Sequence, residues 1–317
     1  QAIGGIIFSR ISDKHYRRKT LIICQVFGVL SGLILLYFNL NIWFLALIAL
    51  TFNPLPVARA ALLDNFPGQP SLRVIGFTYF LKFTPWVFST IFGQADYDFS
   101  VKFIFLCLLL STGATIVLFK DPYDKQLRTE HKTPIKWNNK YVIMILIAFI
   151  FAEQTFYIEW DEIEHLAKLR GAFPLVTFGT LTGILIATIY PKFPHVSLIT
   201  ICYMIGVAVA ASIVFQYYIT EDPTFNTLII CMNIYAIIGG LYLPLFADLL
   251  ISVLGKERRA FGSALAESGE AIASMLAAIT SYYILFDPMK IAGAYFILYL
   301  ASSILQKYSE KLHLEYS

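Results

Sequence analysis

Long, unbroken runs of hydrophobic residues recur along this chain, and each is about as long as the roughly 20 residues that a helix needs to cross a bilayer. Because the runs are continuous and do not alternate with polar positions, they predict helices. A shorter apolar stub at residues 2–9 predicts the end of a further, partial helix. The runs predict ten full transmembrane helices, near residues 20–38, 42–63, 74–95, 101–119, 140–158, 171–190, 196–219, 226–254, 260–286 and 289–305.

The composition supports a membrane protein over a soluble one. Of the 317 residues, 58% are hydrophobic and only 14% are charged. Ordinary soluble domains carry about 25% charged residues. The mean hydropathy is +0.68. We therefore predict an all-α, polytopic membrane protein whose surroundings are the lipid bilayer. The net charge of +3 is too small to indicate a nucleic-acid partner.

The basic residues predict the orientation of the chain in its membrane. If the stub ends on one side, that side carries 18 of the 24 Lys and Arg residues, and the opposite side carries four. The positive-inside rule makes the richer side cytoplasmic. We therefore expect the polar stretch at residues 120–139 and the C-terminus to face the cytoplasm, in an inner or plasma membrane.

That polar stretch also predicts the domain organisation. It separates an N-terminal transmembrane half, residues 1–119, from a C-terminal half, residues 140–317. A weak internal echo links the halves, because the sequence at 55–63 resembles that at 243–250 and each is followed by a short basic turn. Two repeated halves are the architecture of many secondary transporters. The chain opens at Gln1 directly in the apolar stub, so we expect the first residues of a longer protein to be missing.

The most specific motif lies at residues 9–19, Ser-Arg-Ile-Ser-Asp-Lys-His-Tyr-Arg-Arg-Lys. It resembles the signature of the major facilitator superfamily, Gly-x-x-x-Asp-Arg/Lys-x-Gly-Arg-Arg/Lys, which lies between helices 2 and 3 of that family. Ser9 and Tyr16 stand where the family usually has glycines. The segment at 255–259 also resembles this family. The resemblance implies two pseudo-repeated halves, with helix 1 and most of helix 2 absent here. The matching residues are Asp13, Lys14, Arg17 and Arg18.

The motif residues predict a gate. Asp13 is placed to cap the N-terminus of a neighbouring helix, where the helix dipole favours an anion. Arg17 can reach Asp64, at the cytoplasmic end of the helix predicted over 42–63, with its two-pronged guanidinium. The resemblance implies that such contacts, with Lys14 and Arg18, keep the cytoplasmic side closed. The alternative is a solvated surface ion pair, which contributes little.

Charged residues inside predicted spans are the candidates for the substrate or ion pathway, because charge within a membrane is costly. The resemblance implies that the family's helices 4, 7 and 10 line a central cavity. Arg59, Glu153 and Asp248 lie in the spans that correspond to these helices and are the candidates to face the cavity. For Arg59 and Asp248, a structural salt bridge between the halves or snorkelling to the interface is an equal alternative. The full set is Arg59, Lys82, Glu153, Asp248, Glu267 and Glu270.

The helix predicted over 260–286 carries a polar stripe. Glu267 and Glu270 are three residues apart and share one face, so in a poorly solvated place they are expected to hold a proton near neutral pH. Glu270 lies nearer the middle of the span and is the predicted proton carrier. The alternative is that both glutamates pair with Lys82 or Arg59. The stripe consists of Ser263, Glu267, Glu270, Ser274 and Ser281, beside a small-residue ridge of Gly262, Ala266, Gly269 and Ala273.

These observations predict a secondary transporter, a symporter or antiporter that moves a small solute by alternating access, with proton coupling. The sequence contains no nucleotide-binding or nucleophile motif, so we expect neither an enzyme nor a bound cofactor or metal. Two alternatives remain open. One is an inactive remnant of a truncated transporter, and the other is a polytopic membrane enzyme, although the histidines do not cluster.

Overall fold

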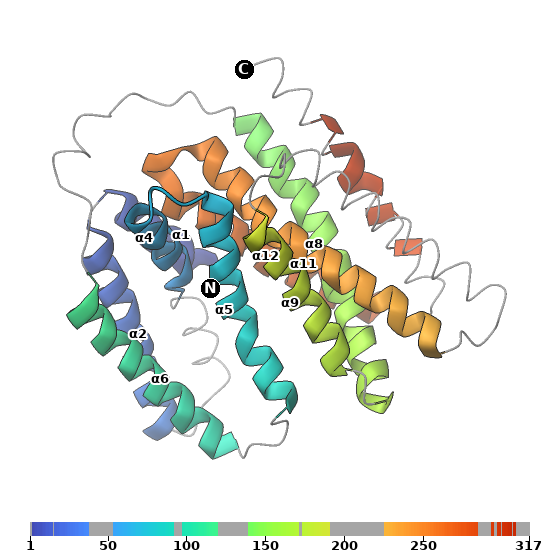
Figure 1. The fold of residues 1–317 in the computed structure, drawn as a ribbon, viewed down its shortest axis with the longest axis horizontal. Helices are drawn as coiled ribbons and strands as arrows, with labels where there is room; N and C mark the ends of the chain where they lie inside the picture. Colours follow the sequence, from blue (N-terminus) through green and yellow to red (C-terminus); the bar gives the residue numbers. More distant parts are fainter. Residues whose placement is uncertain are drawn as a thin grey trace. The chain divides into compact units, whose positions relative to one another are not determined.

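The structure, a computed structural model, is built from helices (Figure 1). It describes residues 2–14, 16–37, 53–91, 97–119, 139–170, 173–190 and 225–284, and residues 293–294, 297–298, 300–305 and 307–308. Every regular element in these ranges is helical, which confirms the all-α prediction. The predicted span at 196–219, nearly all of the linker at 120–139 and the motif residue His15 lie outside the described residues.

The helices follow the predicted hydrophobic runs closely. The helix that follows the predicted linker is longer than its predicted span and continues to Arg170, and the apolar stub continues as helix to Lys14. The elements are α1 (Ala2–Lys14), α2 (Arg17–Tyr37), α4 (Leu55–Asn65), α5 (Ser71–Ile91), α6 (Tyr97–Leu118), α8 (Asn139–Arg170), α9 (Phe173–Ile189), α11 (Phe225–Leu254), the 3-10 helix η1 (Lys256–Arg258) and α12 (Arg259–Ile284).

Proline and glycine mark several helix ends. Pro54 occupies the N-cap of α4, where a missing N–H costs nothing. Pro70 immediately precedes α5. Gly255 ends α11 with a positive φ of 80°, a left-handed conformation that glycine adopts without steric cost. This turn brings η1 and α12 directly after α11.

The chain forms two compact units, and neither is continuous in sequence. The first unit comprises residues 1–69, 92–137 and 250–268, and the second comprises residues 70–91, 138–249 and 269–317. In the first unit, α2 lies along α6, and α1 contacts α2, α4 and η1 (Figure 1). The predicted division into two sequence halves is a different property and stays a prediction.

In the second unit, close helix packing depends on small residues. α5 packs along α9, and a Cβ atom on Gly76 would lie 3.3 Å from the Cα of Thr188. α9 and α11 approach even more closely. A Cβ atom on Gly183 would clash with the carbonyl oxygen of Ile237 and lie 2.7 Å from the backbone nitrogen of Leu241. Small residues at such crossings are typical of membrane helix pairs.

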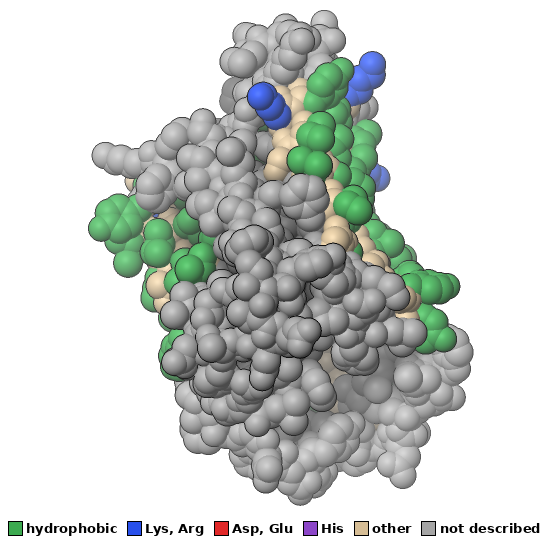
Figure 2. Space-filling model, turned by 90° about the vertical axis from the view of Figure 1, so that its right-hand side faces the viewer, with side chains coloured by type: hydrophobic (Ala, Val, Ile, Leu, Met, Phe, Trp, Pro, Cys, Tyr) green, Lys and Arg blue, Asp and Glu red, His purple; other side chains and the backbone are tan. Residues whose placement is uncertain are grey.

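The outer surface of several helices is hydrophobic. α6 exposes Leu110, Val117 and Leu118, and α12 exposes Met275 and Ile279. Figure 2 shows one face on which the described side chains are mostly hydrophobic. Within the described residues, the part of α11 from Ala236 to Leu254 is long and apolar enough by itself to cross a membrane. The exposed hydrophobic surfaces of α6 and α12 are suited to contact with lipid.

Candidate functional site

A buried group of charged residues joins α1, α2, α4 and α12 in the first unit. The Arg17 guanidinium donates from Nη1 to Oδ1 of Asp13, at 2.9 Å, and from Nε to Oδ2 of Asp64. Arg259, the first residue of α12, donates from Nη1 to Oδ1 of Asp64, at 2.7 Å. We call Asp13, Arg17, Asp64 and Arg259 the Asp13 cluster. Two arginines and two aspartates therefore alternate in one chain of ion pairs.

Asp13 also binds the start of α12 through the backbone. Its Oδ2 accepts from the N–H of Phe261, at 2.9 Å, and its Oδ1 accepts from the N–H of Ala260, at 3.2 Å. The first N–H groups of a helix have no partner within the helix, and the helix dipole favours an anion there. These contacts match the geometry predicted for Asp13 and Arg17, and the gate role itself stays a prediction.

Burial of the Asp13 cluster changes how the Asp13 carboxyl binds protons. Only 8% of its side chain is exposed. Loss of solvation raises the pKa of the Asp13 carboxyl above its usual 3.8, while the charge of Arg17 and the N–H of Phe261 act in the opposite direction. The Arg17 side chain is only 2% exposed, so this pair is buried and differs from the solvated surface pair that was the alternative.

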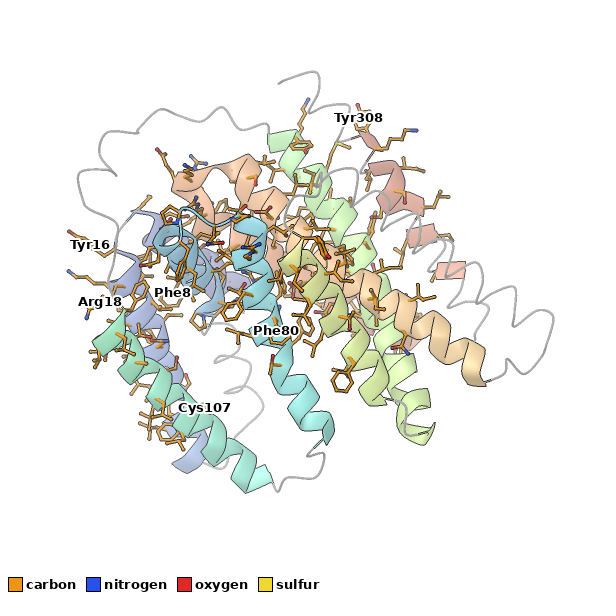
Figure 3. All side chains as sticks on the ribbon, viewed as in Figure 1. Phe8, Tyr16, Arg18, Phe80, Cys107 and Tyr308 are labelled. Carbon is orange, nitrogen blue, oxygen red and sulfur yellow. The ribbon has the colours of Figure 1, made fainter. Side chains whose placement is uncertain are left out.

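Two of the predicted gate residues lie away from the Asp13 cluster, and one residue of the cluster was not predicted from the sequence. Lys14 is exposed, and Arg18, seen at the outer side of α2 in Figure 3, donates from Nη2 to the carbonyl oxygen of Ile116, at 2.5 Å. Arg259 was not predicted as a site residue. The basic segment at 255–259 was the available signal, but only the fold brings its last arginine to Asp64.

A second buried ion pair lies deeper in α4, still in the first unit. Arg59 is fully buried and donates to Oε1 of Glu267, at 3.0 Å, and to Oγ of Ser263, at 2.8 Å. Snorkelling requires that the charged end reach water, so this burial excludes it for Arg59. The salt-bridge alternative is the arrangement found.

A third ion pair lies in the second unit. The Lys82 ammonium on α5 binds Oε2 of Glu270 on α12, and the Tyr79 hydroxyl donates to Oε1 of the same carboxylate, at 2.9 Å. Lys82 Nζ also lies 5.4 Å from the centroid of the Tyr79 ring and 5.9 Å from that of Phe83. Both oxygens of Glu270 are thus engaged from α5.

These two pairs bear on the prediction of a shared proton between the glutamates of α12, which itself stays a prediction. Glu267 and Glu270 were expected to hold a proton between them, and in the structure each carboxylate binds its own cation. The alternative given with that prediction is therefore the arrangement found. Sequence spacing placed the glutamates on one helix face, but it could not show that α4 and α5 bring a cation to each.

Glu153 on α8 is buried and accepts a hydrogen bond from the Tyr242 hydroxyl on α11. Phe149 lies one turn earlier on α8, edge-on to the Tyr242 ring at 6.0 Å between centroids, and it stacks on Phe246 at 3.8 Å. The carboxylate therefore lies beside an aromatic cluster. Asp248, the remaining predicted pathway residue, is also buried on α11.

The polar stripe and the ridge of α12 are placed largely as predicted. Ser263, Glu267 and Glu270 are buried, whereas Ser274 is exposed and the Ser281 side chain lies outside the described residues. The four ridge residues are buried as well. A Cβ atom on Gly269 would lie 2.9 Å from Cδ1 of Phe149, which shows how closely α8 approaches this ridge.

Helices with hydrophobic outer surfaces and buried ion pairs between them define the class of polytopic α-helical membrane proteins. The model of the Major Facilitator Superfamily matches residues 1–278. The chain belongs to this superfamily, which confirms the resemblance seen at residues 9–19, and it is an integral membrane transport protein.

Solved structures of the same superfamily share the fold. The human organic anion transporter MFSD10 (TETRAN) superposes with a TM-score of 0.70 at 12% identity, over 96% of this chain and 80% of that one. The proton:xylose symporter XylE, bound to 6-bromo-6-deoxy-D-glucose, superposes with a TM-score of 0.67 at 13% identity, over 98% of this chain and 83% of that one. Among curated proteins no match is found.

Proposed function

We propose that this chain moves a small solute across its membrane by alternating access, coupled to protons, and that the Asp13 cluster holds the cytoplasmic side closed. The observation that carries the proposal is the contact of Asp13 with the N-terminus of α12. One carboxylate ties the last turn of α1 to a helix that lies more than 240 residues later in the chain. A contact between such distant segments can open and close as a unit.

The orientation in this proposal comes from the distribution of basic residues. The Asp13 cluster, the linker at 120–139 and the C-terminus all lie on the side that carries 18 of the 24 Lys and Arg residues. By the positive-inside rule this side is cytoplasmic. The Asp13 cluster would then close the cytoplasmic entrance while the opposite side is open.

Glu270 is the proton carrier in the proposal. Its side chain is 6% exposed, whereas its partner Lys82 is 29% exposed. If a step of the transport cycle moves Lys82 away, a buried carboxylate remains, and such a carboxylate favours its protonated form. Proton binding would therefore follow the separation of a cation from Glu270, and not the repulsion between two glutamates.

The test is solute uptake into vesicles that contain the purified chain. The first panel holds xylose and small organic anions, the kinds of solute named for the two structural neighbours. An imposed pH gradient should accelerate uptake by the wild type and by Glu267→Gln, but not by Glu270→Gln. Acceleration of Glu270→Gln equal to that of the wild type would contradict the carrier role. A folded wild type that moves no solute in a wider panel would indicate the inactive remnant.

A further inference from the structure

The position of Lys82 on α5 is unusual for a lysine within a predicted membrane span. It lies eight residues after the start of the span at residue 74, about 12 Å by helical rise. It shares a helix face with Ile75 and Tyr79, both fully buried, because residues three and seven apart lie on one side. Yet 29% of its side chain is exposed. The lipid-facing side of α5 is instead marked by Phe77 and Leu81, which are about half exposed.

The exposed part of Lys82 therefore lies on the helix face of Ile75 and Tyr79, and not on the face of Phe77 and Leu81. A charged side chain in contact with lipid is costly, and charges within spans nearly always face the bundle interior or a water-filled cavity. Arg59, the cation of the other intramembrane pair, is fully buried and differs in this respect. The ammonium of Lys82 is therefore the one of these two cations that is open to its surroundings.

Within the Lys82–Glu270 pair, the lysine is the partner that can exchange. Glu270 is held at both oxygens, by Tyr79 and by Lys82, and is nearly buried. Lysine carries a compact charge on a flexible four-carbon stem with three donors. The rings of Tyr79 and Phe83 lie within the roughly 6 Å at which aromatic faces attract a cation. An incoming anion can thus bind the ammonium while Glu270 stays in place.

We propose that Lys82 is an anion-binding residue of the transport pathway, where the carboxylate or other oxyanion of a small organic solute exchanges with Glu270. The inference rests on the proposed transport function and adds the class of solute, an organic anion. When the anion binds Lys82, one proton from water binds an oxygen of Glu270. The site therefore takes up one negative and one positive charge together, and its net charge does not change.

The other charged groups on α8 and α12 near this site are each bound by another residue. α5 contributes Tyr79 and Lys82 to Glu270. α8 packs against Gly269 through Phe149 and carries Glu153, which accepts from Tyr242 of α11. On α12 itself, Glu267 is bound by Arg59. An anion attracted to this site would therefore bind the accessible ammonium.

The experiment measures labelling of a cysteine beside Lys82 by charged thiol reagents, and it needs no knowledge of the solute. Phe83→Cys is made after the four native cysteines are replaced by serine. Its reaction rates with sulfonatoethyl methanethiosulfonate, an anion, and with trimethylammonium-ethyl methanethiosulfonate, a cation, are compared in vesicles. The matched control is Leu81→Cys, at the same depth on the lipid-facing side, which should react with neither reagent.

We expect the anionic reagent to be preferred at Phe83→Cys. Lys82→Met should lower the ratio of anionic to cationic rates by about tenfold, and Glu270→Gln should raise it by about tenfold, from the loss of one charge at roughly 6 Å in a partly aqueous site. No reaction with either reagent, or a ratio that Lys82→Met leaves unchanged, would overturn the proposal.

A second measurement uses the unaltered chain, in case Phe83→Cys does not fold. Sulfosuccinimidyl acetate, a water-soluble amine reagent, should acetylate Lys82 of the wild type, as mass spectrometry would show. Modification of the exposed Lys14 and Lys256 without any of Lys82 would overturn the aqueous access. The expected labelling with no uptake of any solute would contradict the proposed transport but not the anion site, whereas uptake without the charge preference would contradict the site alone.

Discussion

At the scale of single residues, the effect of substituting a charged side chain depends on the partners that it binds in the fold. Asp13 binds three groups and Asp64 binds two, and Arg17 bridges the two carboxylates. Breaking a buried ion pair by removing one partner costs about 3–5 kcal/mol, because the other charge remains buried. The strongest residue-level effects are therefore expected at buried pairs and not at the exposed motif residues.

Asp13→Asn should slow transport and leave the affinity for solute nearly unchanged. The amide keeps an oxygen near the first N–H groups of α12 but loses the negative charge that Arg17 and the helix dipole favour. A loss of about 1.4 kcal/mol in the closed state corresponds to a roughly tenfold slower cycle. Uptake rates over a range of solute concentrations measure it, with the exposed Lys14→Gln as control. A lower affinity with unchanged turnover would contradict the gate.

Arg59→Ala should lower the free energy of unfolding by about 3 kcal/mol, because it leaves the Glu267 carboxylate buried without its cation. The double variant Arg59→Ala/Glu267→Ala should recover much of this loss, since no uncompensated charge remains. Thermal unfolding in detergent compares the two single variants with the double variant. Additive losses in the double variant would show that the two side chains do not stabilise each other.

At the scale of elements, α12 provides most of the contacts that matter for function. Its first N–H groups bind Asp13, its buried glutamates bind Arg59 and Lys82, and Thr280 near its end accepts from Gln154 of α8, at 2.7 Å. The small residues of the ridge let α8 approach this helix closely. α12 thus carries residues of both the predicted gate and the predicted proton site.

Close crossing of α9 and α11 gives a prediction at this scale. Gly183→Ala should destabilise the fold by about 1–3 kcal/mol or more, because the added methyl group meets backbone atoms of α11, which cannot rotate away as a side chain can. Gly113→Ala on α6 is the matched control. Among the described residues, no atom outside the neighbouring backbone of α6 lies within 4 Å of its added Cβ, so the higher helix propensity of alanine should leave the protein as stable or slightly more stable. Equal unfolding temperatures for both variants would contradict the crossing.

At the scale of the whole molecule, the topology is the property still to be measured. Asn138→Cys, in the predicted cytoplasmic linker, should not react with an impermeant thiol reagent added outside intact cells, after the four native cysteines are replaced. Asp161→Cys, beyond the opposite end of the predicted span at 140–158, should react. The opposite pattern would reverse the orientation, and with it the side on which the Asp13 cluster lies.

Much of the fold could be predicted because hydrophobic runs depend only on local composition. α2, α5, α6, α9, α11 and α12 agree with the predicted spans to within a few residues, since a helix in lipid must satisfy its own backbone hydrogen bonds. The extension of α8 to Arg170 was missed, because its last turns are polar and carry no hydrophobic signal. The predicted spans also ended the helix of the stub too early, at residue 9.

The sequence by itself determined the class of protein, the buried positions in the first half of α12 and the identity of the charged residues that are costly in lipid, since each follows from the cost of polarity in a bilayer. It also indicated the family, through Asp13 and Arg17. Only the tertiary structure decided the partners. Glu267 and Glu270 are neighbours on one helix, yet they bind Arg59 and Lys82, some 190 to 210 positions earlier in the chain. Pairing between distant segments depends on helix packing, which no local pattern records, and that packing leaves Arg59 fully buried but the Lys82 side chain partly exposed.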